Sequence, residues 1–314
     1  MVLGKIGLTG STGMLGRHLQ AALERAGAEV VAVSRSDAAS GAVSSCWDLS
    51  EWRDLEALDS MFPGIQAIVH AGALVQTSGN IDTARMFDAN VRACLNLGNW
   101  ASSRNVPMIY ISGAIVYADT CALVQKETAP LGWDGLGGFY GFSKLFAEDV
   151  LMRLSQHGLK LAIIRPTSIY GSGITNDKMV PRFLSLAQAG QTIALTEPVD
   201  DRVDIMHAAD VSSAVLAILE REAWGIFNLS SGHPVSVREL AQTCVEVTGR
   251  GAISISGSVP ADYQPAIRYS LDIERARSRL DWQPSIDLFR GLKMLLENQI
   301  LMPLPGSQLT DNNL

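Results

Sequence analysis

The sequence has few of the features that mark disulfide-bonded, metal-binding or membrane proteins. It holds only four cysteines, at 46, 94, 121 and 244, which are far apart, and its five histidines are scattered. This spacing favours neither a disulfide framework nor a metal site. No apolar run approaches the roughly 20 residues that span a bilayer, and glycines stand where a signal peptide would have its apolar core. We therefore expect a soluble, cytoplasmic protein without a metal and without membrane contact.

Charged residues are also scarce. They make up 18% of the chain and leave a net charge of −7, with no run of Lys or Arg. Such a balance gives no general attraction to nucleic acid or to anionic lipid, so nucleic acid is not an expected partner. With 314 residues, of which 47% are hydrophobic, the chain is long enough for one large or two modest domains around a real core.

The N-terminal segment carries a candidate dinucleotide site. A short apolar run over 2–8 is followed by three glycines and then by an apolar pattern of helical spacing over 14–26. In a strand, turn and helix of this kind, Gly10 permits a tight turn, Gly13 lets a pyrophosphate approach backbone N–H groups, and Gly16 lets helix and strand pack closely. The residues expected at the pyrophosphate are Gly10, Thr12, Gly13, Met14, Leu15 and Gly16.

The end of the second predicted strand, 29–34, bears on which dinucleotide is bound. An acidic residue there would accept hydrogen bonds from the ribose 2′-hydroxyl of NAD. The sequence has Ser34 followed by Arg35 instead. A small neutral side chain beside a guanidinium suits the 2′-phosphate of NADP better, and Arg17 is a second candidate contact. NADP is therefore favoured and NAD is the alternative, although both arginines could equally be solvated surface residues.

Two further segments are expected to line the cofactor. One segment, Asp48-Leu49, comes at the spacing where this type of fold usually meets the edge of the adenine. The other follows a predicted strand over 65–70, and its small side chains leave room for a bound molecule. His70, which ends that strand, is expected to be packed rather than to carry a proton. The expected contacts are Asp48, Leu49, Ala71, Gly72 and Ala73.

Tyr140 and Lys144 form the motif around which the rest of the chain is arranged. They are four positions apart and open an apolar helical pattern, so they share one helix face. Tyrosine, with an ordinary pKa of about 10, is a poor acid or base near neutrality, but a fixed ammonium one turn away favours its phenolate. Such a pair can exchange a proton with a carbinol or carbonyl if a cofactor carries the hydride. Taken alone, the pair could equally be an exposed neighbour pair.

The order of predicted elements indicates two parts. Strands and helices alternate over 1–170, which predicts an α/β fold, a Rossmann-type doubly wound parallel sheet with its ligand at the carboxyl ends of the strands. This part includes a long helix over 81–104 and strands over 106–112 and 159–165, the last of them stopped by Pro166.

From residue 171 onwards the regular alternation is lost, which indicates a smaller C-terminal α/β lobe that binds substrate. We assign 171–202 and 223–300 to this substrate-binding lobe, return 203–222 to the Rossmann domain, and expect a loose tail at 301–314.

The glycine turn that begins at Thr9 and the pair Tyr140-x-x-x-Lys144 together resemble the extended short-chain dehydrogenase/reductase superfamily, in its NAD(P)-dependent epimerase/dehydratase family. The likeness runs nearly the whole length. Its other signposts, in the family's order, are His70-Ala-Gly-Ala, Asn90-Val, Arg165-Pro, Tyr170-Gly, Arg202 to Val211, Phe227-Asn-Leu and Leu280-Asp-Trp-Gln-Pro284. The resemblance implies a nucleotide sugar as the typical substrate, other carbonyls in some branches, and often a homodimer through the helices near Ile81 and Tyr140.

Carried over to this sequence, the resemblance makes Tyr140 the general acid/base and Lys144 the residue that favours the phenolate and binds the nicotinamide ribose. It also adds Asn90, Tyr140 and Pro166 to the cofactor contacts. The family's third catalytic residue is a serine or threonine four positions before the tyrosine of its Ser/Thr-x-x-Val-Tyr-Gly segment, but this sequence has Gly113 there.

Loss of that hydrogen-bond donor typically costs about 10²–10³ in rate. Ser112 is the adjacent hydroxyl, and it can substitute only if the strand end is twisted or bulged, because consecutive strand side chains point to opposite faces. Glycine at this position therefore also leaves open a nucleotide-binding protein with weakened catalysis that works as a sensor or partner module.

The same window bears on the reaction type. Sugar-nucleotide 4,6-dehydratases place an Asp-Glu pair after the threonine, where this sequence has Ala114 and Ile115. Dehydration by that route is not expected, which leaves reduction of a ketone or epimerisation through a keto intermediate.

An apolar loop over 131–139 leaves open a reductase of an apolar carbonyl. The expected substrate contacts are Gly113, Ala114, Arg202 and Arg268, because a diphosphate requires cationic side chains.

Overall fold

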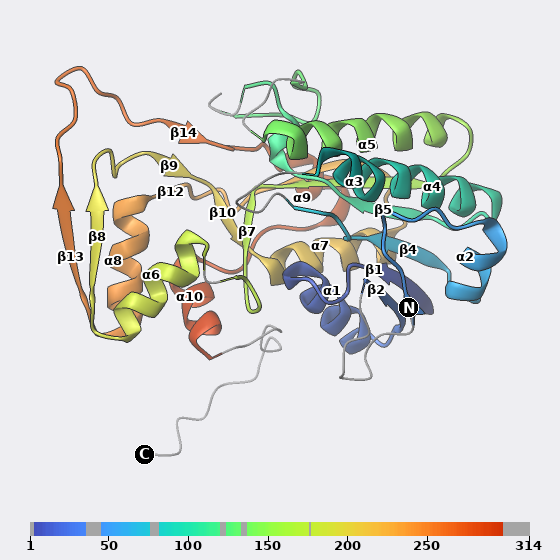
Figure 1. Ribbon diagram of the computed structural model, residues 1–314, viewed down its shortest axis with the longest axis horizontal. Coiled ribbons are helices and arrows are strands. Elements are labelled where there is room, and N and C mark those ends of the chain that lie inside the picture. Colours follow the sequence, from blue (N-terminus) through green and yellow to red (C-terminus); the bar gives the residue numbers. More distant parts are fainter. Residues whose placement is uncertain are drawn as a thin grey trace, which may run out of the picture.

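The computed structural model describes residues 3–35, 45–75, 82–119, 124–132, 137–175 and 177–297, and the structural statements that follow concern these residues. A central sheet with helices on both faces stands beside a smaller lobe, formed by the later part of the chain (Figure 1). No helix among the described residues is long and apolar enough to cross a membrane. The last predicted segment, the tail at 301–314, lies outside the described residues.

The central sheet has seven parallel strands in the order β11-β6-β5-β4-β1-β2-β3. The predicted Rossmann-type fold is thereby confirmed. The order changes direction between β1 and β4, and in open α/β sheets ligands bind beyond the carboxyl ends of the strands at such a switch point. The strands are β1 Lys5–Thr9, β2 Glu29–Ser34, β3 Ser45–Cys46, β4 Ala67–His70, β5 Met108–Ile111, β6 Leu161–Pro166 and β11 Gly225–Leu229.

Two helical layers cover the sheet (Figure 1). One layer packs its apolar side chains around Leu8, Ile109 and Ile164, and the other packs around Ile68 and Met108 on the opposite face. Neighbouring strand residues face opposite layers, which is why these strands read as continuous apolar runs. The first layer holds α1 Met14–Arg25, α7 Ala208–Arg221 and α9 Glu274–Leu280, and the second holds α2 Leu55–Met61, α4 Ala93–Ser103 and α5 Gly138–Gln156.

The predicted long helix over 81–104 is present from Thr83 but is not uniform. It consists of α3 Thr83–Phe87, a π-helical turn η1 Asp88–Arg92, and α4. Residue 81 lies outside the described part. Periodicity cannot reveal the wider turn, because the apolar spacing continues through it, and such turns are frequent at functional sites.

The smaller lobe has its own apolar core, which includes Phe183, Leu195, Leu240 and Leu292. Two short strands, β8 and β13, pair in parallel at its outer edge. The elements outside the sheet and its two layers are η2 Ala114–Val116, β7 Ser168–Tyr170, α6 Met179–Gln188, β8 Thr192–Thr196, β9 Arg202–Val203, β10 Ile205–His207, β12 Val235–Ser236, α8 Val237–Thr248, β13 Ala252–Ser256, β14 Ile267–Arg268 and α10 Leu288–Leu296.

Two sequence-based assignments are corrected here. Strand β11 lay within the stretch 223–300 assigned to the lobe, but it pairs with β6 as the edge of the central sheet, and α9 packs beside it in the first helical layer. An apolar run does not reveal which sheet it joins. Pro166 does not stop the strand, because it is the last residue of β6 and pairs with Leu229. The division of the chain into two domains otherwise stays a prediction.

Candidate active site

The glycine turn joins β1 to α1 and leaves no room for a Cβ at its first and third glycines. Gly10 has a φ of +72°, and a Cβ there would lie 2.6 Å from the Cα of Gly72. A Cβ on Gly16 would lie 2.0 Å from the carbonyl oxygen of Gly10. Helix α1 begins without a side-chain cap on its first N–H groups. Since those groups carry partial positive charge, the turn fits a pyrophosphate, as the glycine spacing predicts.

The segments expected around the adenosine lie beside this turn. Leu49 approaches Gly72 so closely that a Cβ on that glycine would be 2.6 Å from the Leu49 Cδ1 atom. Asp48 accepts hydrogen bonds from Ser50 and pairs with Arg85 at 2.8 Å. Burial raises the pKa of the Asp48 carboxyl, but the hydrogen bonds from Ser50 and Arg85 outweigh this and hold the pKa below its ordinary value.

The arginines proposed for the ribose end differ in their surroundings. Arg35 is exposed directly after β2, whereas Ser34 is buried. Arg17 donates from its Nε to the carbonyl oxygen of Thr12 at 3.1 Å, and its guanidinium also lies near Gly173. Arg17 is therefore turned towards the glycine turn, and Arg35 is the candidate beside the end of β2.

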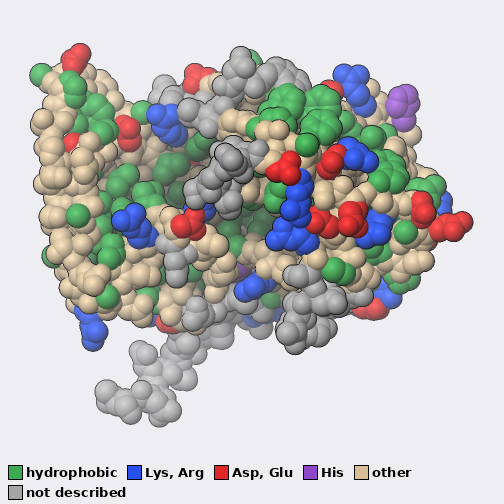
Figure 2. All heavy atoms as spheres, in the orientation of Figure 1, with side chains coloured by type: hydrophobic (Ala, Val, Ile, Leu, Met, Phe, Trp, Pro, Cys, Tyr) green, Lys and Arg blue, Asp and Glu red, His purple; other side chains and the backbone are tan. Residues whose placement is uncertain are grey.

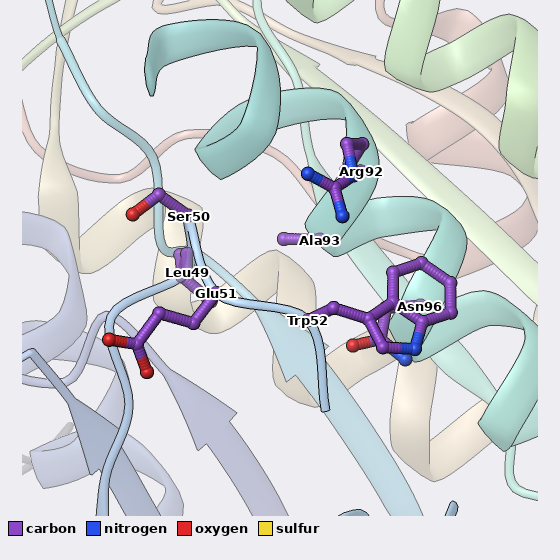
Figure 3. A pocket seen from close by; sticks show the side chains of 7 residues that line it. All are labelled: Leu49, Ser50, Glu51, Trp52, Arg92, Ala93 and Asn96. Atoms are coloured by element: carbon purple, nitrogen blue, oxygen red, sulfur yellow. The ribbon is translucent and has the colours of Figure 1, made fainter. Parts of the chain in front are cut away.

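A shallow hollow lies next to Leu49 (Figure 3). Arg92 lies over the ring of Trp52, 5.9 Å from its centre, and the amide of Asn96 is hydrogen-bonded to the backbone of Arg53. The hollow contains neither Tyr140 nor Lys144, and we assign it no catalytic role. It is lined by Leu49, Ser50, Glu51, Trp52, Arg92, Ala93 and Asn96.

Helix α5 places Tyr140 in its first turn and Lys144 one turn later. The Lys144 side chain is buried, and its Nζ donates to the carbonyl oxygen of Ile111, the last residue of β5, at 2.8 Å. The same Nζ lies 5.9 Å from the centre of the Tyr140 ring and 4.9 Å from the centre of the Tyr110 ring. The ammonium is thus fixed at the carboxyl end of the sheet, within reach of Tyr140.

The Asn90 side chain forms hydrogen bonds that join two segments of the site, a role that the sequence did not show. From the π-helical turn, its side chain accepts from the backbone N–H of Leu74 at 2.7 Å and donates to the Leu74 carbonyl oxygen at 3.0 Å. It also donates to Ser143 Oγ at 2.9 Å, and that hydroxyl donates to the carbonyl oxygen of Tyr140 at 2.7 Å. Asn90 therefore ties the segment after β4 to the helix that carries Tyr140.

The chain after β5 carries the position where the family has a hydroxyl. Ser112 is buried, and its Oγ has no hydrogen-bond partner among the described residues. Gly113 is fully extended, and a Cβ there would meet only Ile115 and Pro166, at 3.8 and 3.9 Å. A side chain therefore fits at 113 without strain. Ala114 is buried. Glycine and alanine have no polar side-chain atom, so neither 113 nor 114 supplies a polar group from its side chain.

The two arginines expected at a diphosphate lie on neighbouring strands. Arg202 and Arg268 belong to β9 and β14, which pair in parallel. Arg202 already donates to Glu239 at 2.5 Å and to the Pro234 carbonyl oxygen at 3.0 Å. Its guanidinium is therefore partly engaged by the protein itself, which the sequence could not show because the partner is 37 residues away.

His70 is fully buried, as expected for a packed histidine. Its Nδ1 is hydrogen-bonded to Thr9 Oγ1 at 2.6 Å, and its ring stacks on Tyr110. Burial, together with the charge of Lys144, lowers the pKa of His70 to about 3. His207, packed edge-on against the rings of His18 and Tyr170, also has its pKa lowered to about 3, by burial and then by His18 and Arg290.

Because both histidines are buried, we expect the folded protein to lose stability on acidification. Both stay neutral in the folded protein, whereas in the unfolded chain each takes up a proton near pH 6.5, so folding is favoured above that pH and disfavoured progressively as the pH falls towards 3. We expect each to remove about 2 kcal/mol from the free energy of unfolding between pH 7 and 5. Denaturant titrations at both values measure this.

A matched control for that titration is His233→Gln, because His233 is exposed. The control should leave the pH dependence unchanged, whereas His207→Phe, which keeps a ring in place, should remove about half of it. Equal stability of the parent protein at pH 7 and 5 would contradict the assignment of two buried neutral histidines.

The glycine turn at the switch point and the fixed Tyr140–Lys144 pair define a class: a Rossmann-type α/β protein of the short-chain dehydrogenase/reductase type. The model of the NAD dependent epimerase/dehydratase family matches residues 6–230. The chain belongs to this family, which covers the greater part of its length.

Several of the similar proteins are named for reactions of sugar nucleotides. A dTDP-4-dehydro-6-deoxy-D-allose reductase of Streptomyces sp is 27% identical over 302 residues, covering 88% of this chain and 90% of the relative. Two solved structures share the fold: UDP-N-acetylglucosamine 4-epimerase from Bacillus cereus (TM-score 0.81, 23% identity, 94% of this chain and 99% of that one) and MoeE5 in complex with UDP-glucose and NAD (TM-score 0.78, 24% identity, 94% and 98%).

Proposed function

We propose that the protein is an NAD(P)-dependent oxidoreductase or epimerase that acts on a secondary alcohol or ketone of a nucleotide-sugar-like substrate. The observation that carries this proposal is the position of Lys144: its Nζ donates to the carbonyl oxygen of Ile111, the residue before Ser112, and lies 5.9 Å from the centre of the Tyr140 ring. The named reductase and the two solved structures support the substrate class.

In this proposal the glycine turn and the segment 71–73 hold the dinucleotide, which supplies or accepts the hydride. Tyr140 then gives a proton to the substrate oxygen or removes one from it. Lys144 keeps a positive charge next to the phenol and binds the nicotinamide ribose. Ser112, whose Oγ has no hydrogen-bond partner in the described part of the chain, is the hydroxyl nearest in sequence to the position held by Gly113, and we propose it as the group that steadies the substrate oxygen.

Reduction or epimerisation fits the site better than dehydration. Ile115 occupies the second position of the Asp-Glu pair of 4,6-dehydratases, and it packs against the first turn of α5. A Cβ on Gly137 would lie 2.4 Å from the Ile115 side chain, and one on Gly141 would lie 3.4 Å from it. An aliphatic side chain in this place cannot exchange protons with the carbon skeleton.

For the cofactor we propose NADP over NAD. The carboxylate that would receive the ribose 2′-hydroxyl of NAD is replaced by Ser34, and Arg35 is exposed directly after it. For the substrate we propose that Gly113 and Ala114 border the reacting sugar, while Arg202 and Arg268 meet the diphosphate.

The function is tested by incubating the purified protein with NADPH or NADH and a panel of nucleotide 4-keto sugars and nucleotide sugars. Oxidation of the reduced cofactor in step with loss of the ketone would establish a reductase. Interconversion of two epimers without net cofactor change would establish an epimerase. Absence of both reactions, with cofactor bound, would favour the two alternatives, a reductase of an apolar carbonyl and the sensor or partner module.

We also propose a homodimer through the outer face of α5 and α3. Partly exposed phenylalanines form a chain of ring contacts there, with ring centres 5.5 to 5.8 Å apart, and Figure 2 shows hydrophobic side chains gathered on that part of the surface. Apolar patches of this kind mark interaction surfaces. The residues are Phe87, Phe139, Phe142 and Phe146.

Light scattering is expected to give twice the mass of the chain, and Phe142→Asp is expected to give the monomer, because a carboxylate in an apolar interface is costly to bury. The control is Phe289→Asp, which changes a more exposed phenylalanine on the lobe helix α10, away from the proposed interface. A monomeric parent protein at micromolar concentration would contradict the dimer.

A further inference from the structure

A buried ion pair joins the sheet to the helix that carries Tyr140 and Lys144. Arg165 of β6 and Glu148 of α5 are each only 1% exposed, and the guanidinium donates to both carboxylate oxygens at 2.6 to 3.1 Å. Glu148 lies one helical turn after Lys144. Burying two charges costs several kcal/mol per ion before the pairing repays it, so the pair by itself is weak evidence for stability.

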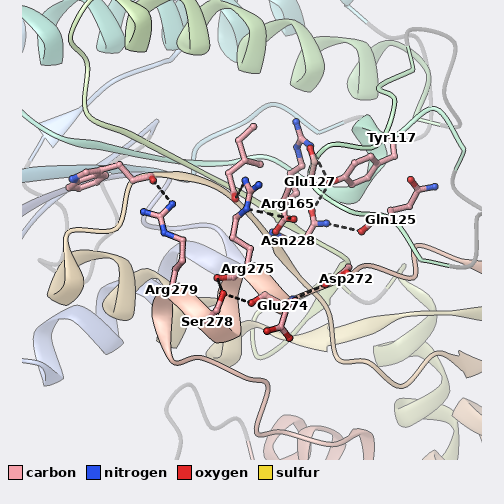
Figure 4. Close-up of polar contacts among 12 residues, drawn as sticks. Tyr117, Gln125, Glu127, Arg165, Asn228, Asp272, Glu274, Arg275, Ser278 and Arg279 are labelled. Atoms are coloured by element: carbon pink, nitrogen blue, oxygen red, sulfur yellow. Dashed lines mark hydrogen bonds and ion pairs between the residues drawn. The ribbon is translucent and has the colours of Figure 1, made fainter.

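The same guanidinium reaches the turn that carries Gly113. Arg165 Nη1 donates to the hydroxyl of Tyr117 at 3.1 Å and to the carbonyl oxygen of Glu127 at 3.1 Å. The Tyr117 hydroxyl donates in turn to Asn228 of β11 at 2.6 Å. Figure 4 shows these side chains converging from separate parts of the chain. Tyr117 directly follows the helical turn η2, and so it fixes the end of the segment that begins at Ser112.

The network continues to the chain that returns from the lobe. Asn228 donates to the carbonyl oxygen of Gln125 at 2.9 Å. Gln125 is held by backbone hydrogen bonds to Ser270 and Asp272, at 2.9 and 2.8 Å, and this stretch follows β14, which carries Arg268. One connected set of contacts therefore links α5 at Glu148, the turn after β5, and the chain that directly follows the strand holding a proposed substrate arginine.

We propose that Arg165 is a positioning residue, whose guanidinium, held by Glu148, fixes helix α5 and the turn 113–117 in one relative geometry for catalysis. Both halves of the candidate site depend on it: Tyr140 and Lys144 come from α5, and Ser112 and Gly113 precede the turn. A guanidinium suits this task because its planar set of donors serves three partners at once, which the single ammonium of lysine does not. The inference rests on the proposed function for what is being positioned.

The test replaces both charges by apolar side chains of similar size, Arg165→Met with Glu148→Leu. Such a replacement is often neutral for stability, so the denaturant midpoint should stay near that of the parent protein. Turnover should nevertheless fall by about 10- to 100-fold at unchanged cofactor affinity, because small misplacements of reacting groups are costly. Amide hydrogen exchange at residues 114–117 and 138–144 should become about tenfold faster.

The control pair is Asp149 and Arg153, which form an exposed ion pair at 2.9 Å on the same helix. Asp149→Leu with Arg153→Met should change neither turnover nor exchange. If the buried double variant keeps the parent's turnover and exchange, Arg165 only compensates a buried charge and the inference is wrong. If the double variant fails to fold, Tyr117→Phe replaces it in the test, because it removes only one hydroxyl from the network. Unchanged turnover and exchange in this variant would likewise overturn the inference. Hydrogen exchange is measured without substrate. It therefore still decides this inference if the parent protein is inactive, a result that would overturn only the proposed function.

Discussion

Replacing Tyr140 by phenylalanine is expected to lower turnover by about 10²–10⁴-fold, the range that a positioned acid/base contributes. The phenyl ring keeps the packing of the first turn of α5 and its place near Lys144, where the two groups are 5.9 Å apart. Only the hydroxyl is lost. The glycine turn and the segment 71–73, which supply most of the proposed cofactor contacts, are unchanged, so the dissociation constant of the cofactor should stay close to that of the parent protein.

The measurement is steady-state turnover with the best nucleotide sugar of the panel, with cofactor affinity from the quenching of protein fluorescence. A Tyr140→Phe protein that keeps more than about a tenth of the parent's turnover would remove the phenol from the mechanism. Loss of cofactor affinity in the same variant would instead show that the substitution disturbs the site as a whole.

The change Gly113→Ser is expected to raise turnover by about 10- to 100-fold. It restores a hydroxyl at the position where the family's serine or threonine stands, and one such donor is typically worth about 10²–10³. The structure tolerates the change, because the backbone is extended and a Cβ would have only ordinary contacts, with Ile115 and Pro166 at 3.8 and 3.9 Å. The expected gain in turnover is smaller than the full worth of one donor, because in our proposal the Ser112 hydroxyl already steadies the substrate oxygen.

Gly113→Ala is the matched control, since it adds the Cβ without the hydroxyl. Alanine should leave turnover near that of the parent protein. If serine and alanine behave alike, position 113 does not face the substrate oxygen. If serine leaves turnover unchanged while Tyr140→Phe abolishes it, the view of this chain as a weakened, sensor-like protein fails, because the site is then already complete without the hydroxyl.

Local patterns predicted much of this molecule. The glycine turn, the continuous apolar strands and the Tyr140–Lys144 spacing are each contained within a few residues, and the parallel sheet follows from their alternation. Long-range pairings were not predictable in this way. Strand β11 joins the central sheet through β6, some 60 residues earlier in the chain, and no feature of its five residues distinguishes that partner from the lobe.

The candidate site shows the same limit. Asn90 stays a predicted cofactor contact, and its amide also holds Leu74 and Ser143, which depends on a π-helical turn that apolar spacing does not reveal. In the sequence, Arg165 stands out only as part of the family's Arg-Pro signpost, because its partners Glu148 and Tyr117 meet it only when three separate segments fold together.

The most direct test of the central claim is the nucleotide that the purified protein carries, released by denaturation and identified by mass spectrometry, followed by titration of NADPH and NADH into the stripped protein. We predict that a nicotinamide dinucleotide binds and that NADPH binds more tightly than NADH. Tightly held NAD would retain the hydride chemistry but favour an epimerase and remove the role of Arg35. Release of no dinucleotide, with no binding of either reduced form, would contradict the proposed function.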